Sequence, residues 1–159
     1  MGYNMVNIAA VLNDLGPSQK AFYLIKEFNK AIKDTKKSVC VFFERPSVPV
    51  TKPLFACSNI SFFSGYHDIA ISTNLHEAET LLKSYNKSDK YLYLWDIDWL
   101  EKPVYYKTAQ KIILNDRLKI IARSKDHANV IENFCNKSPV GIVDNWRLDQ
   151  LIGVTNADR

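Results

Sequence analysis

Glycine is scarce in this sequence, and its scarcity excludes the common nucleotide-binding loops. Only five of the 159 residues are glycine, and the turn NDLGPSQ after the first apolar segment contains one of them, Gly16. This turn matches neither GxGxxG nor GxxxxGK followed by Ser or Thr, so an ordinary dinucleotide or P-loop site is not expected. The GxSxG elbow of serine hydrolases is also missing from the sequence, which excludes that chemistry.

Cysteine and long apolar runs are scarce as well. Cys40, Cys57 and Cys135 are an odd number of cysteines, lie far apart and form no CxxC pair, which argues against a disulfide framework and a zinc site. No apolar run approaches the roughly 18 residues of a membrane span, and the N-terminus lacks the basic leader of a signal peptide. We therefore expect a reduced, cytoplasmic protein that does not contact a membrane.

The charge of the chain is mild and evenly spread. Its 21 basic and 17 acidic residues give a net charge of +4, and the basic residues form no patch of the kind that binds nucleic acid. This balance permits a phosphate-bearing ligand. Hydrophobic residues make up 47% and charged residues 24% of the chain, which predicts one folded domain over residues 1–159.

Apolar segments and helical patterns alternate along the chain. Strands separated by helices imply βαβ crossovers and a mostly parallel sheet, and near-continuous apolar strands indicate burial on both faces. The sequence therefore predicts a three-layer, doubly wound, Rossmann-like α/β fold. The expected strands are 5–12, 39–44, 60–63, 68–72, 91–95, 118–123 and 140–143, and the expected helices are one that begins near Ser18, 75–85, 104–116, 124–136 and a short one in the tail 145–159.

In such folds ligands bind beyond the carboxyl ends of the strands, which directs attention to the polar residues there. Gly16 and Ser18 open a helix whose N–H groups attract anions, although a plain turn before a helix has the same sequence. His76 follows a strand and is a candidate base, with a helix-start surface residue as the alternative. Arg123 and Ser124 follow another strand, and Ser124 is also a plausible helix N-cap.

Asp96 and Asp98 end the apolar segment YLYLW as an Asp-x-Asp pair. Their carboxylates point to the same side if the strand geometry continues, so they are able to hold a divalent cation. Three interpretations stay open: a phosphatase-like nucleophile, a metal site, and a loop that is structural or contacts a ligand without metal. The last is favoured, so neither a metal nor a cofactor is expected.

The order of the segments resembles the N-terminal Rossmann-like half of GT-B glycosyltransferases. The resemblance covers about residues 6–146 and rests on NIAAVLNDLGPSQKAFYLIKEFNKA, VCVFFE, DIAISTNLHEAETLL, YLYLWDIDWL, LKIIARSKDHANVIENF and VGIVDNW. It implies that Gly16, His76, Asp96 and Arg123 face an acceptor-side cleft. The donor-binding C-terminal half of that family has no counterpart in these segments, so the resemblance also implies a separate donor-binding partner chain or a homodimer.

Three functions follow from these patterns. The favoured one is a glycosyltransferase-like half-domain that takes a nucleotide sugar, with His76 or Asp96 as the acceptor base. The second is a non-catalytic assembly module, whose partner surface would include Trp95, Trp99, Tyr105, Tyr106 and Trp146. Small phage and mobile-element proteins are often of this kind, which makes such an origin a candidate. The third is a small Mg-dependent phosphate enzyme that uses Asp96 and Asp98.

Overall fold

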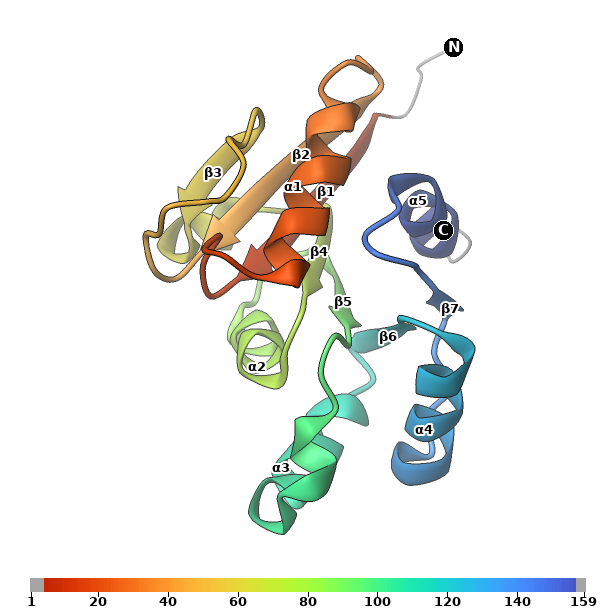
Figure 1. Ribbon diagram of the computed structural model, residues 1–159. Helices are drawn as coiled ribbons and strands as arrows, with labels where there is room; N and C mark the ends of the chain where they lie inside the picture. Colours follow the sequence, from red (N-terminus) through yellow and green to blue (C-terminus); the bar gives the residue numbers. More distant parts are fainter. Residues whose placement is uncertain (1–4, 157–159) are drawn as a thin grey trace.

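The computed structural model describes residues 5–156, apart from the side chains of Asp98, Glu101 and Asn156. Its strands form one sheet in which all neighbouring pairs are parallel, in the order β3-β2-β1-β4-β5-β6-β7 (Figure 1). This order confirms the predicted Rossmann-like α/β fold. The strands are β1 (Val6–Leu12), β2 (Lys37–Phe43), β3 (Ala56–Asn59), β4 (Ile69–Ser72), β5 (Asp89–Tyr93), β6 (Leu118–Ala122) and β7 (Gly141–Ile142).

Helices cover both faces of the sheet and complete the three layers. On one face, α1 (Gln19–Ala31) and α5 (Leu148–Asn156) pack against the strands. The other face is covered by the 3₁₀ helix η1 (Ile60–Gly65) and by α2 (Leu75–Lys83), α3 (Pro103–Ile113) and α4 (Lys125–Cys135). A second 3₁₀ helix, η2 (Asp98–Glu101), precedes α3. None of the helices within residues 5–156 has the length and apolar character needed to span a membrane.

The segment YLYLW shows how the sequence fills both layers. Successive side chains of a strand point to opposite faces, so Tyr91, Tyr93 and Trp95 enter the core beneath α1 and α5. Leu92 and Leu94 enter the core beneath α2, α3 and α4. All five side chains are buried, which explains why the segment reads as continuously apolar.

One predicted strand is wrong. Residues 60–63 form the start of η1 rather than an edge strand, and β3 lies just before them. The side chain of Asn59 ends the strand, because its Oδ1 accepts a hydrogen bond from the N–H of Ser61 at 3.0 Å. Such a local side-chain acceptor competes with the sheet ladder for the backbone. Phe63 is then buried against Phe42 on the sheet.

Candidate functional site

The carboxyl end of β1 is the point where the strand order reverses. β2 and β4 flank β1 on its two sides, and β1 is followed by the loop 13–18, β2 by Glu44 and β4 by Thr73 and Asn74. These loops lie at one edge of the sheet because all the strands are parallel. Ligands of doubly wound folds bind at such a switch point, so the candidate site is centred there.

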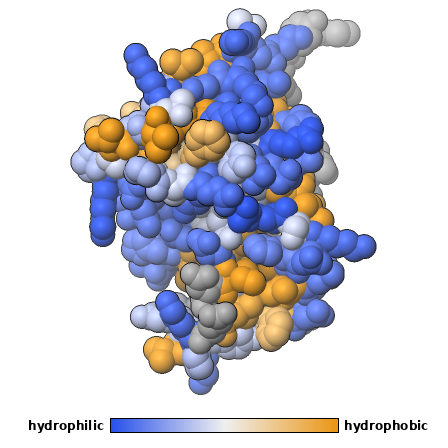
Figure 2. Space-filling model, in the orientation of Figure 1, coloured by the Kyte–Doolittle hydropathy of each residue, from blue (hydrophilic) through white to orange (hydrophobic). Residues whose placement is uncertain are grey.

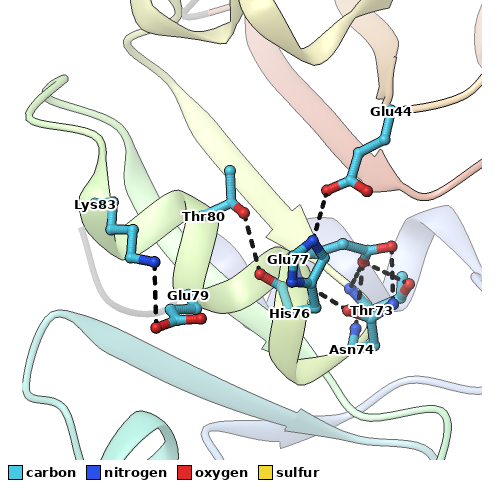
Figure 3. Close-up of polar contacts among 8 residues, drawn as sticks. All are labelled: Glu44, Thr73, Asn74, His76, Glu77, Glu79, Thr80 and Lys83. Atoms are coloured by element: carbon cyan, nitrogen blue, oxygen red, sulfur yellow. Dashed lines mark hydrogen bonds and ion pairs between the residues drawn. The ribbon is translucent and has the colours of Figure 1, made fainter.

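His76 and Glu44 form a polar pair across this edge. Nε2 of His76, on the first turn of α2, lies 3.2 Å from Oε1 of Glu44 at the end of β2 (Figure 3). The imidazole is 68% exposed and the carboxylate 21%, so solvent and ligands reach the imidazole more easily. A carboxylate that accepts a hydrogen bond from one ring nitrogen leaves the other nitrogen as the proton acceptor. This arrangement suits a general base.

Glu77 lies next to His76 in the sequence, but its side chain points away from it toward the β4–α2 loop (Figure 3). Oε2 accepts hydrogen bonds from the N–H of Thr73 at 2.8 Å and from its hydroxyl at 2.9 Å. Asn74 caps α2 by accepting from the N–H of Glu77, and together they form a capping box. Burial raises the pKa of Glu77, while the charge of Lys20 and the donors from Thr73 oppose that rise.

Two backbone N–H groups of the loop after β1 already donate hydrogen bonds to side chains. The N–H of Gly16 donates to Oδ1 of Asp14 at 2.8 Å, and the N–H of Leu15 donates to Oγ of Ser47 at 3.0 Å. Ser18 is the N-cap of α1 and accepts from the N–H of Ala21. An α-helix leaves its first N–H groups without internal partners, so the first turn of α1 is the part of this loop suited to an anion.

Arg123 lies over an aromatic surface further along the same edge. Its guanidinium carbon lies 3.8 Å from the ring centroid of Trp95, a cation–π distance. Trp95 in turn stacks on Trp146, with 6.4 Å between the ring centroids. Arg123 is half-exposed, so it still presents a positive charge to solvent at this edge of the sheet. Ser124 accepts from the N–H of His127 and is the N-cap of α4, as predicted.

Asp96 is exposed at the end of β5, whereas the side chain of Asp98 lies outside the described residues. Across the rest of the described chain, no three His, Cys, Asp or Glu side chains gather closely enough to hold a metal ion. The Asp96–Asp98 metal site stays an open alternative to the favoured loop without metal. Among the aromatic residues expected at a partner surface, the three tryptophans are buried and that expectation was wrong for them; Tyr105 alone is 58% exposed.

Sequence reasoning missed two features of the site. Glu44 was placed at a strand end without a partner, because nothing in the sequence shows that β2 and β4 both flank β1. The capping role of Glu77 was not predicted, although Asn74 followed three residues later by Glu77 is a capping-box signal. That signal was available in TNLHE.

Searches for a matching family model, a matching curated protein and a matching solved structure all return nothing. The class of protein is therefore defined by its fold, a Rossmann-like α/β domain with an all-parallel sheet.

Proposed function

We propose that this chain is a glycosyltransferase-like half-domain that binds the acceptor side of a nucleotide-sugar reaction. The single observation that carries the proposal is the His76–Glu44 pair over the end of β1. The binding site for the sugar nucleotide would be completed by a second, donor-binding protein, either a partner chain or another copy of this chain. The resemblance of residues 6–146 to the N-terminal half of GT-B enzymes supports the same assignment.

The proposed reaction is the transfer of a glycosyl group to a hydroxyl. His76 takes the proton of the acceptor hydroxyl, whose oxygen forms a bond to the anomeric carbon. The bond from that carbon to the phosphate oxygen breaks, and the nucleoside diphosphate leaves with the electron pair. Glu44 holds the imidazole and stabilises its protonated form. The first turn of α1 and the charge of Arg123 favour the anionic leaving group.

The test is a transfer assay with nucleotide sugars and the purified chain, alone and with any co-purifying partner. We expect the His76→Ala variant to lose about 10²–10⁴-fold in rate, the range for one general base. His67→Ala is the matched control, because His67 precedes β4 at the opposite edge of the sheet. If calorimetry detects no hydrolysis and no binding of any nucleotide sugar, the enzymatic proposal is contradicted.

A second candidate is the assembly module, favoured by exposed apolar residues in the segment between β2 and β3. Val48 and Val50 are 83% and 65% exposed, and Figure 2 shows apolar surface at the upper left, where this segment lies. Sedimentation of the wild type and of a Val48→Asp, Val50→Asp variant tests it. A monomer at all concentrations, with no co-purifying protein, contradicts this candidate.

A further inference from the structure

A groove runs between α2 and α3 and begins at His76. One hollow of about 480 Å³ is lined by His76, Trp99, Lys102 and Tyr105. A second, of about 470 Å³, is lined by Lys83, Lys107 and Lys111. The two share Glu79, Thr108 and Ile112, so they adjoin along the helix pair, which lies in the lower part of Figure 1.

Helical spacing places these side chains on facing surfaces. Tyr105, Thr108 and Ile112 recur at intervals of three and four residues on α3, which puts them on one face of the helix. His76 and Glu79 are three residues apart on α2 and face them. The groove therefore follows largely from the packing of two regular helices, and Trp99 of η2 and Lys102 just before α3 close its end nearest His76.

The end nearest His76 has the chemistry of a sugar subsite. Tyr105 is 58% exposed and offers an aromatic face, while the buried Trp99 forms the wall and lies 6.3 Å from Tyr106 between ring centroids. Apolar and aromatic walls with a few polar groups are typical of small-ligand sites. Glu79, Lys102 and Thr108 supply hydrogen-bonding groups for hydroxyls around this aromatic surface.

The groove carries an excess of positive charge, which favours negatively charged ligands. Lys83, Lys102, Lys107 and Lys111 line it, and the acidic residue that lines both hollows is Glu79, whose Oε1 lies 3.3 Å from Nζ of Lys83. Among the described lining residues, four lysines stand against one glutamate, which leaves a net charge of +3 when His76 is neutral. A groove of one sign concentrates ligands of the other sign.

We propose that the α2–α3 groove binds an acidic oligosaccharide, with its terminal sugar against Tyr105 and its next residues along Lys107 and Lys111. This inference deepens the proposed function and rests on it, because the terminal hydroxyl beside His76 becomes the acceptor. The substrate class is a carboxylate-bearing glycan chain rather than a free monosaccharide.

The test compares tetragalacturonate with maltotetraose, an uncharged oligosaccharide of the same length, by calorimetry at low ionic strength. We expect the acidic chain to bind about tenfold or more tightly, a difference that added salt removes. Lys107→Glu with Lys111→Glu should abolish the preference. The matched control, Lys26→Glu with Lys33→Glu, makes the same change in net charge at exposed positions away from the groove and should keep it.

A separate variant tests the contribution of Tyr105 at the end of the groove nearest His76. Tyr105→Ala should weaken both oligosaccharides about tenfold through loss of the ring contact. Val104→Ala is the control, because Val104 is exposed and does not line the groove. No binding of either oligosaccharide, equal binding of both, or equal effects of groove and control variants overturns the inference.

Failure of this inference and failure of the proposed function give different results. Glu44→Gln should slow transfer and keep tetragalacturonate binding, because Glu44 lines neither hollow. Binding in the groove without transfer to any acceptor removes the enzymatic proposal and leaves the glycan groove. Transfer that is unaffected by Tyr105→Ala and by the Lys107→Glu, Lys111→Glu pair removes the groove and leaves the enzyme.

Discussion

Nε2 of His76 lies 3.2 Å from Oε1 of Glu44, and this contact joins the first turn of α2 to the residue that follows β2, over the end of β1. The two residues are 32 positions apart in the sequence, and their strands are not neighbours in the sheet. The pair thus marks the switch point of the fold with an exposed imidazole and a carboxylate beside it.

The first prediction separates the roles of the two residues. Glu44→Gln keeps an acceptor oxygen for the imidazole but removes the negative charge that stabilises its protonated form. We expect transfer to fall about tenfold, less than the about 10²–10⁴-fold fall on loss of the base itself. Steady-state rates for Glu44→Gln, His76→Ala and the double variant measure this; losses that multiply independently would contradict a shared role.

The second prediction concerns Glu77 and pH. Burial raises its pKa in the folded state, so the folded protein binds this proton more tightly than the unfolded chain, where the pKa is about 4.3. The contribution of Glu77 to stability is therefore fully present below about pH 4.3 and is lost as pH rises through the folded value.

Thermal unfolding of the wild type and of Glu77→Gln between about pH 4 and pH 8 tests this linkage. The variant should be less stable by about 1–3 kcal/mol, since its amide oxygen replaces Oε2 but its –NH₂ is unable to accept the hydrogen bond that Oε1 accepts from Nδ2 of Asn74. The difference between the two proteins should shrink as pH rises. Parallel curves would show that Glu77 has the same pKa in both states.

The third prediction uses two glycines near the C-terminus. A Cβ on Gly141 would lie 2.4 Å from Cγ2 of Val154, so β7 and α5 would have to move apart. Gly141→Ala should lower the free energy of unfolding by about 1–3 kcal/mol, as overpacking does. On α5 itself, a Cβ on Gly153 meets no described atom within 4 Å.

Gly153→Ala is therefore the matched control and should raise stability by up to about 1 kcal/mol through helix propensity. Urea unfolding of both variants measures the difference. Equal effects of the two substitutions would mean that β7 and α5 do not pack as the structure shows.

The fourth prediction addresses the phosphate-enzyme alternative. Because the favoured interpretation of Asp96 and Asp98 is a loop without metal, we expect Mg²⁺ and Mn²⁺ to leave the Tm of the wild type unchanged. A rise in Tm that disappears in Asp96→Asn would instead support a metal site at Asp96. Asp144→Asn, which changes an aspartate after β7 at the same edge of the sheet, controls for a general charge effect.

The sequence by itself determined the elements and their parallel arrangement. Apolar runs of strand length alternating with helical patterns leave few topologies other than a doubly wound sheet. Ser124 was correctly predicted as an N-cap because capping depends on residues three positions apart. The expected strand at 60–63 was wrong because the hydrogen bond between Asn59 and Ser61 outweighed the apolar pattern.

Only the tertiary structure decided which residues meet. Strand order is set by packing between segments far apart in the chain, so nothing in the sequence signalled the contact between His76 and Glu44. The same packing buried Trp95, Trp99 and Trp146, which the assembly-module interpretation had placed at a partner surface. Local patterns fix which face of an element is apolar, whereas the contacts between faces depend on distances that no short stretch of sequence encodes.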